Sequence, residues 1–243
     1  LASAFNNMAE SMQKLEEQRS EFISNVSHEL KTPMTSISGF VDGILDGTIP
    51  PERQNHYLEI VRSEVQRLSR LVGKLLLTSR LESNTQELSL RTVELCGLIG
   101  TVAFGMEPAI EKKNISVNID LPSERMFVVA DPDALTQIVT NLLDNAVKYG
   151  EENGRIEVSV KKKGDLATVS VYNTGLGIKK EELPHVFDRF YKADRSRGLD
   201  KDSTGLGLYI VKSLLSRQNQ TITVESEEGA YARFTFTLEL AKI

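Results

Sequence analysis

An isolated histidine with an acidic neighbour is the first candidate for chemistry in this sequence. Glu29 follows His28 directly, and a carboxylate that accepts the proton of one ring nitrogen leaves the lone pair of the other nitrogen free to attack an electrophile. Thr32 lies one helical turn further on. A zinc site of the H-E-x-x-H type is excluded, because Thr32 stands where the second histidine is required. On position alone, an ordinary surface histidine is the simpler interpretation.

Carboxamides and a lysine form the second candidate group. They lie on a helix that is predicted to begin at residues 131–133, where a proline stands between two acidic residues. Asn141, Asn145 and Lys148 form a stripe about 60° wide beside the apolar face of this helix. Amide oxygens can ligate Mg²⁺ and a lysine can meet phosphate oxygens, although a solvated polar stripe is the alternative. The apolar face comprises Leu135, Ile138, Val139, Leu142, Leu143, Ala146 and Val147.

Two short glycine motifs form the third candidate group. Residues 173–177 follow a predicted strand, and residues 203–208 open a predicted helix. Gly205 and Gly207 lie where backbone N–H groups at a helix start can reach phosphate oxygens. Each motif alone is a weak signal, and neither has the spacing of a Walker loop or of a Rossmann dinucleotide motif. Only the ordered set of motifs indicates a nucleotide site.

The elements that position these groups begin with two long helices. Apolar residues recur at alternating steps of three and four, which is the pattern of a helix that pairs with another helix. The pattern shifts by one residue after Val26 and resumes after a break at residues 47–51. The apolar positions are Phe5, Met8, Met12, Leu15, Phe22 and Val26, then Leu30, Met34, Ile37, Val41 and Ile44, and finally Leu58, Val61, Val65, Leu68, Val72 and Leu75.

Two helices joined by a short break form an antiparallel hairpin. One hairpin cannot cover both of its apolar faces, so we expect two copies to form a dimeric four-helix bundle. His28 points about 200° away from both Val26 and Leu30, which predicts an exposed imidazole. The one-residue shift suggests that the bundle can switch between two packings.

From about residue 87 the sequence is typical of a mixed α and β domain. Alternating apolar residues predict strands, and a period of 3.6 predicts helices between them. The expected strands are residues 115–121, 156–160, 166–173, 221–226 and 234–240, and the expected helices are residues 95–113, 132–149 and 206–218. The fold class is therefore multidomain, α followed by α+β, with the sheet of the second domain covered by helices.

Composition excludes several classes of protein. The net charge of −5 provides no global positive field for nucleic acid or anionic lipid. The single cysteine permits no internal disulfide, and the three histidines lack ligand-like spacing. No apolar run approaches the ~18 residues that cross a bilayer. The sequence starts inside a periodic pattern, so we expect it to be part of a longer protein.

The motifs together resemble a known family. Residues 22–37 closely resemble the phospho-acceptor box of sensor histidine kinases. The ordered segments 141–145, 173–177, 187–190 and 205–208 resemble the ATP-binding domain shared by histidine kinases, gyrase, Hsp90 and MutL (the GHKL, or Bergerat, type of α/β sandwich). The phenylalanine pair at 187 and 190 narrows this resemblance to the histidine kinases, and the resemblance covers nearly the whole chain.

The resemblance implies a role for each candidate residue. His28 would be the phospho-acceptor and Glu29 its base or orienting group, while Thr32 would position water during dephosphorylation of a partner. Asn145 would hold Mg²⁺ with Asn141 assisting. The remaining nucleotide-binding residues implied are Lys148, Tyr149, Asn173, Gly175, Gly177, Gly205, Leu206, Gly207 and Leu208. Residues 190–204 would form a lid over ATP, from which Arg195 and Arg197 would approach the phosphates.

Two positions depart from the family pattern. Asn173 stands where the family usually has the aspartate that accepts the adenine amino group, and Ser203 stands where glycine is common. The amide oxygen of Asn173 can also accept that hydrogen bond, so activity is expected to survive. A pseudokinase that binds ATP without transferring phosphate is one alternative. A gyrase- or MutL-like ATPase is the other, although the histidine-bearing hairpin argues against it.

The domain organisation implied is an end of a HAMP-like signalling helix (1–19), a dimerisation and phospho-acceptor domain (20–84) and a catalytic ATP-binding domain (85–243). The expected function is ATP-dependent autophosphorylation on His28, followed by transfer to an aspartate of a response regulator and dephosphorylation of that regulator. The expected partners are a second copy, the regulator and an upstream transmembrane sensor. The chain would then be the cytoplasmic portion of a bacterial cell-membrane protein.

Overall fold

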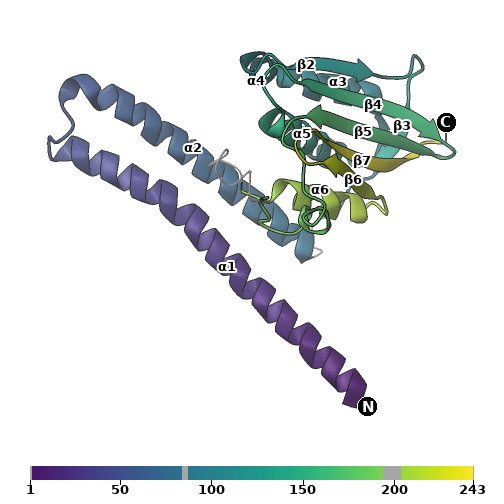
Figure 1. Cartoon of the computed structure of the whole chain (residues 1–243), viewed down its shortest axis with the longest axis horizontal. Coiled ribbons are helices and arrows are strands. Elements are labelled where there is room, and N and C mark those ends of the chain that lie inside the picture. Colours follow the sequence, from purple (N-terminus) through teal and green to yellow (C-terminus); the bar gives the residue numbers. More distant parts are fainter. Residues whose placement is uncertain (1, 84–86, 194–203, 243) are drawn as a thin grey trace. The chain divides into compact units, whose positions relative to one another are not determined.

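Two long antiparallel helices, α1 (Ala2–Leu45) and α2 (Pro51–Glu82), build the first part of the computed structural model (Figure 1). The structure describes residues 2–83, 87–193 and 204–242, and the chain divides into two units, Leu1–Leu77 and Thr78–Ile243. Near the turn, the rings of Phe40 and Tyr57 lie 5.1 Å apart. The predicted helical hairpin is confirmed.

The apolar seam of the hairpin stays partly exposed within one chain. Met34 is 58% exposed on α1, and Leu58, Val65 and Val72 on α2 are 48%, 51% and 42% exposed. A single hairpin therefore covers only part of its apolar surface, as the periodicity predicts. Gly47 adopts a φ of 78° in the connection between the helices, a conformation that glycine tolerates best.

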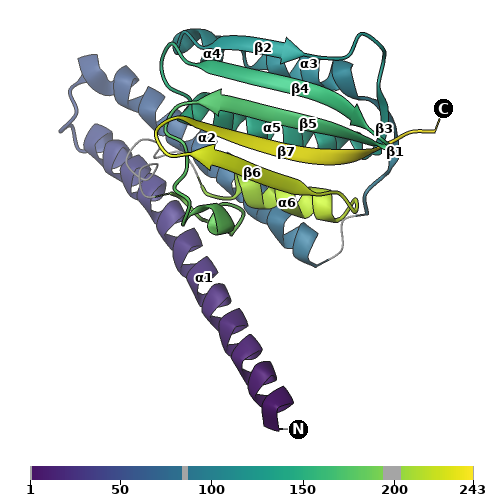
Figure 2. The same ribbon diagram turned by 45° about the vertical axis from the view of Figure 1, so that its right-hand side comes forward.

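A seven-stranded sheet with helices on one face builds the second unit (Figure 2). The strand order is β1-β3-β7-β5-β4-β2, and β6 pairs with the same strand β7. Only β2 and β4 run parallel. The strands are β1 (Arg91–Glu94), β2 (Ser116–Asp120), β3 (Phe127–Ala130), β4 (Arg155–Lys163), β5 (Leu166–Thr174), β6 (Ile222–Glu227) and β7 (Tyr231–Leu240), and the helices are α3 (Leu95–Gly105), α4 (Glu107–Lys112), η1 (Leu183–His185), α5 (Pro132–Tyr149) and α6 (Gly207–Ser216).

The core of this unit lies between the sheet and its helices. Alternate residues of β4, β5 and β7 are buried, in agreement with the period of two in the sequence. On α5 the seven predicted apolar residues are all at most 7% exposed. Asp131 caps this helix, because its Oδ1 accepts from the backbone N–H groups of Asp133 and Ala134. The predicted α/β sandwich is confirmed.

Three details differ from the sequence prediction. The predicted helix 95–113 is interrupted at Met106, and α4 begins at Glu107 with Pro108 in its first turn. Strands β1 and β3 were not predicted, because four residues are too few for a clear alternation. The last turn of α2 belongs to the second unit, where Arg217 Nη1 donates to the carbonyl of Leu81 at 3.1 Å.

Two further properties follow from the described residues. None of their helices combines the length and the hydropathy required to span a bilayer. The thiol of Cys96 is half-buried near the start of α3, and burial, with the nearby Glu94 carboxylate, raises its pKa. A raised pKa leaves less reactive thiolate, which agrees with a packing role for this cysteine.

We predict that the α5 face dominates the stability of the second unit. Leu142 is fully buried, so Leu142→Ala should lower the free energy of unfolding by about 2–5 kcal/mol. Leu166 is 38% exposed at the start of β5, so Leu166→Ala is the matched control and should cost less than about 1 kcal/mol. Denaturant unfolding of the full chain measures both. Equal losses would contradict the assignment of the core.

Candidate functional site

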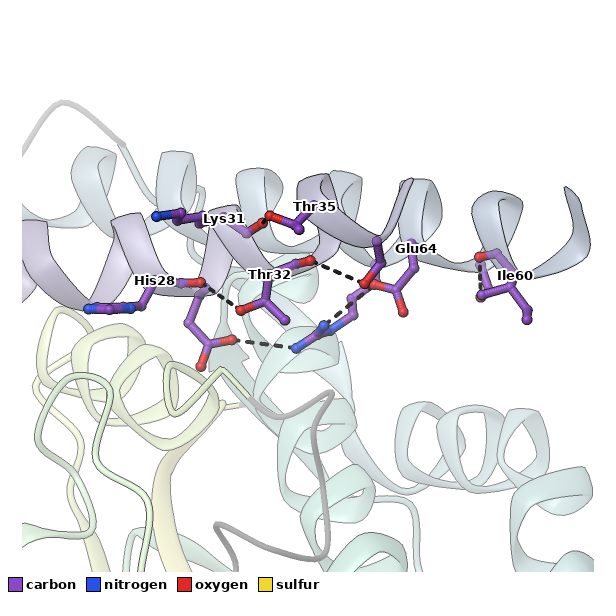
Figure 3. A network of polar contacts seen from close by, with 10 residues as sticks. His28, Lys31, Thr32, Thr35, Ile60 and Glu64 are labelled. Carbon is purple, nitrogen blue, oxygen red and sulfur yellow. Dashed lines mark hydrogen bonds and ion pairs between the residues drawn. The ribbon is translucent and has the colours of Figure 1, made fainter. Parts of the chain in front are cut away.

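The imidazole of His28 is exposed on α1, as predicted (Figure 3). The ring makes no hydrogen bond to another described residue. Thr32 lies one turn along the helix, and its Oγ1 donates to the backbone carbonyl of His28 at 3.2 Å. A neutral, accessible imidazole has a lone pair available for attack on an electrophile, so this position suits a nucleophile.

The carboxylate of Glu29 faces α2 in this structure. Its Oε2 lies 3.6 Å from Nη2 of Arg67, and Nη1 of Arg67 lies 3.5 Å from Oε2 of Glu64. The side chains of Glu29 and Arg67 are only 21% and 14% exposed. Glu29 therefore joins the two helices, and it must leave or share this ion pair to accept the proton of the imidazole.

The helix around His28 has an interrupted hydrogen-bond ladder. Pro33 is buried inside α1 and offers no N–H to the carbonyl of Glu29. Several hydroxyl side chains nearby donate to the carbonyl four residues earlier, which tends to bend a helix. These donors are Ser27, Thr32, Thr35 and Ser36 (Figure 3 draws part of this ladder).

The polar stripe of α5 divides between the core and a pocket. Asn145 and Tyr149 line the pocket. Asn141 is 5% exposed, and its Nδ2 has no hydrogen-bond partner among the described residues. Lys148 does not line the pocket and pairs with Asp144 at 3.0 Å. A buried donor without a partner is costly, so Asn141 is a group that a bound ligand or water can satisfy.

Asn173 ends the buried face of β5. It is 4% exposed and lines the same pocket as Asn145. Its Nδ2 donates to the carbonyl of Thr174 at 3.1 Å, which leaves Oδ1 as an acceptor without a partner among the described residues. A buried acceptor in the pocket lining can bind an amino group, which is the role expected for this position.

Three glycines are required by close backbone contacts. Gly175 has a φ of 143°, and a Cβ there would overlap the carbonyl of Tyr149. Gly177 has a φ of 58°, and a Cβ there would overlap the carbonyl of Glu227. Gly205 has a φ of 67° and packs on the backbone of Phe190. These contacts bring the ends of α5, β5 and β6 to one place, so the glycines shape the pocket wall.

The second glycine motif leads into α6. Leu206 is fully buried, whereas Leu208 lines the pocket. A Cβ on Gly207 would lie 3.8 Å from Oδ1 of Asn141, so the start of α6 packs directly beside the stripe of α5. The structure thus brings the predicted motifs together from four separate stretches of the chain.

The pocket has a cavity volume of about 90 Å³ and is partly open to solvent. Five of the predicted nucleotide-binding residues line it: Asn145, Tyr149, Asn173, Gly177 and Leu208. The others lie outside its lining; of these, Asn141 and Gly207 contact each other, and Gly175 contacts Tyr149. The predicted lid, with Arg195, Arg197 and Ser203, lies largely outside the described residues.

Sequence reasoning missed most of the charged lining. Lys179 and Lys192 provide cations beside the pocket, and Glu182 and Glu228 provide carboxylates. Lys179 follows Gly177 by two residues and Lys192 follows Phe190 by two, so proximity to a recognised motif was the available signal. The remaining lining is mostly apolar: Leu176, Ile178, Val186, Tyr191, Ala193, Ala232 and Phe234.

A divalent cation in this pocket would need ligands from a bound phosphate and from water as well as from the protein. The described residues contain no group of three or more His, Cys, Asp or Glu side chains that could ligate a metal. Mg²⁺ commonly uses few protein oxygens together with phosphate oxygens and water. The amide oxygen of Asn145 in the pocket lining matches that requirement when a phosphate-bearing ligand is present. The partnerless Nδ2 of Asn141 is a donor, so it suits an oxygen of the same ligand or of water.

Two family models match the chain. Residues 18–84 match the His Kinase A (phospho-acceptor) domain, and residues 130–242 match the histidine kinase-, DNA gyrase B-, and HSP90-like ATPase domain. The sensor histidine kinase WalK of Bacillus subtilis is 31% identical over 233 residues, which cover 93% of this chain and 37% of that protein. The chain thus spans little more than a third of that relative.

Solved structures share the fold. The full-length histidine kinase ShkA, in complex with AMPPNP, aligns with a TM-score of 0.68 at 28% identity, over 92% of this chain and 46% of that chain. The histidine kinase ThkA, in complex with the response regulator protein TrrA, aligns with a TM-score of 0.71 over 95% of this chain and 66% of that chain. Its identity of 24% supports the fold alone.

We predict that Gly177 is needed for its backbone contact and not only for its flexibility. Gly177→Ala should lower the free energy of unfolding by about 2–4 kcal/mol, because left-handed strain and the overlap with Glu227 add. Gly229 has a similar φ of 75° with nothing within 4 Å, so Gly229→Ala should cost only about 1 kcal/mol. Thermal or urea unfolding compares them. Equal losses would show that the contact has no effect.

Proposed function

The chain belongs to the sensor histidine kinase family, and on that premise we propose that it transfers the γ-phosphoryl group of ATP to its own His28. The observation that carries this proposal is that one chain contains both an exposed imidazole on α1 and, in its second unit, a pocket whose polar groups suit a nucleotide. ATP is the substrate, and the phosphorylated histidine is the product on the protein.

Adenine recognition is assigned to Asn173 and the apolar residues that line the pocket. Oδ1 of Asn173 accepts from the exocyclic amino group, and the apolar lining covers the base. Amide oxygens carry less negative charge than carboxylates, so this hydrogen bond is weaker than one to the aspartate usual in the family. Neither this change nor the one at Ser203 removes a group that handles phosphate.

Phosphate binding is assigned to α5 and the glycine motifs. Lys148 can exchange its partner Asp144 for a phosphate oxygen, and Lys192 adds a second cation at the pocket. Asn145, with Asn141 assisting, would hold Mg²⁺, which neutralises phosphate charge as the γ-phosphoryl group leaves. The backbone at Gly205 and Gly207 lies at the start of α6, where N–H groups favour anions.

The transfer step needs positioning more than covalent chemistry. One ring nitrogen of His28 attacks the γ-phosphorus in line, the N–P bond forms, and the bond to the bridging oxygen of ADP breaks. The proton on the other ring nitrogen passes to Glu29 or to solvent. Arg67 holds Glu29 beside the acceptor turn until that step, which is a reason for an ion pair at this position.

The later steps involve a second protein. The phosphoryl group passes from His28 to an aspartate of a response regulator, and Thr32 positions water when that regulator is dephosphorylated. The related fold of ThkA is known in complex with a response regulator, which supports a similar partner for this chain. The whole protein is proposed to be a membrane-anchored bacterial sensor, with this chain as its cytoplasmic portion and residues 1–19 as the end of a HAMP-like helix.

Radiolabel transfer tests the proposal directly. The wild-type chain with Mg²⁺ and γ-labelled ATP should acquire acid-labile label, and His28→Gln should reduce that label to background. His56 is an exposed histidine on α2, so His56→Gln is the matched control and should label like wild type. Acid-labile label on His28→Gln would refute the acceptor. ATP binding without label would favour a pseudokinase, and steady hydrolysis without label would favour a gyrase- or MutL-like ATPase.

The exposed seam predicts a homodimer. Val65 is 51% exposed at a seam position of α2, so Val65→Lys should place a charge in the dimer interface and shift the protein toward the monomer. Gln66 is exposed beside it, and Gln66→Lys should leave the dimer intact. Sedimentation velocity measures all three proteins. A monomeric wild type would contradict the four-helix bundle.

A further inference from the structure

A lysine outside the pocket caps the C-terminal end of α5, the helix that carries Asn145 and Tyr149. Nζ of Lys113 donates to the carbonyls of Val147, Lys148 and Gly150 at 2.9, 2.7 and 3.0 Å. An ammonium group has three donors, so all three are used at this one place. Lys113 is itself not among the residues that line the pocket.

The end of α5 needs such a partner. The last carbonyls of a helix have no intrahelical donor, and many helices satisfy them with a glycine in the left-handed conformation. Gly150 follows α5, but it is extended, with a φ of −65° and a ψ of 145°. The chain therefore leaves the helix without that motif, and the ammonium group supplies donors and a positive charge where the helix dipole favours one.

The same turn is joined to the end of β5. Gly150 and Gly175 form an isolated antiparallel bridge, and the N–H of Glu151 donates to the carbonyl of Thr174 at 3.3 Å. The carbonyl of Tyr149 accepts from the N–H of Leu176 at 3.4 Å. Residues from both sides of this junction line the pocket: Asn145 and Tyr149 on α5, and Asn173, Leu176 and Gly177 at and after the end of β5.

Lys113 is also fixed from its own backbone. Its carbonyl accepts from the N–H of Asn153 at 3.0 Å, in the turn that follows the junction. The side chain of Lys113 thus binds the carbonyls at the end of α5, and the backbone carbonyl of Lys113 binds the turn at Asn153. Loss of the ammonium group would remove one hydrogen-bond donor from each of the three carbonyls. The chain that follows the end of α5 would then be held less firmly.

We propose that Lys113 is a positioning residue for the nucleotide, acting through the carbonyls of Val147, Lys148 and Gly150 to set Asn145 and Tyr149 against Asn173. The proposal rests on the nucleotide site assigned above. It predicts a specific kinetic effect: weaker ATP binding with little change in the rate at saturating ATP, because His28 and its surroundings are untouched.

The test measures autophosphorylation of the full chain over a range of ATP concentrations. Lys113→Met should raise the KM for ATP by roughly tenfold, with the maximal rate within about threefold of wild type. Lys113→Arg keeps the charge and donors and should restore the KM to within about threefold. Lys112 is exposed on α4 next to it, so Lys112→Met is the matched control and should match wild type.

Each outcome decides the role of Lys113. A Lys113→Met protein with the wild-type KM would overturn the proposal. So would one whose maximal rate falls with no change in KM, because partial unfolding gives that result. If this variant does not remain folded, Lys113→Gln is measured against the same thresholds. A wild type that binds ATP without taking label contradicts the kinase assignment instead, and ATP dissociation constants of the same variants then replace KM.

Discussion

The C-terminal turn of α5 has to satisfy two requirements at once, and the candidate site depends on that constraint. One face of the helix is sealed in the core by residues such as Leu142 and Val147, while the adjacent stripe presents Asn145 and Tyr149 to a pocket. A rotation of this helix by a few tens of degrees would bury the amides and expose the core. The burial of the apolar face therefore fixes the direction of the polar groups.

The junction with β5 explains why glycines surround this turn. Gly150 and Gly175 approach so closely that a side chain on Gly175 would overlap the carbonyl of Tyr149. The strand consequently ends beside the helix end, and the buried Asn173 lies within the same pocket as Asn145. Asn145 and Asn173 are 28 residues apart in sequence. They line the same pocket because the backbones at the ends of α5 and β5 pack against each other.

His28 and the pocket belong to separate units of the chain, which has a consequence for the proposed phosphoryl transfer. An exposed imidazole in one unit reacts only when the nucleotide in the other is brought to it, so the encounter can be controlled without changing either site. Around His28 the helix is interrupted at Pro33 and joined to α2 through Glu29 and Arg67. A local change in α1 can therefore alter the turn around His28 while the pocket in the second unit stays intact.

The sequence was informative where periodicity and motif order were strong. The two long helices, the exposed His28 and the buried face of α5 followed from spacing, and the convergence of the glycine motifs was implied by the resemblance to histidine kinases. The short strands β1 and β3 did not, because four residues give too little pattern and their pairing depends on distant partners. Lys113 was not predicted either, because its contacts with the end of α5 depend on tertiary structure and on no local signal. Lys179 and Lys192 were missed although each follows a recognised motif by two residues.

The central claim is that the γ-phosphoryl group of ATP is transferred to the imidazole of His28. Mass spectrometry of the chain after incubation with Mg²⁺ and ATP, kept at neutral or alkaline pH to preserve phosphoramidate bonds, locates the modification by residue. The account predicts a phosphoryl group on His28, appearing only when ATP is present. Phosphate on a serine, a threonine or another histidine, with His28 unmodified, would contradict it.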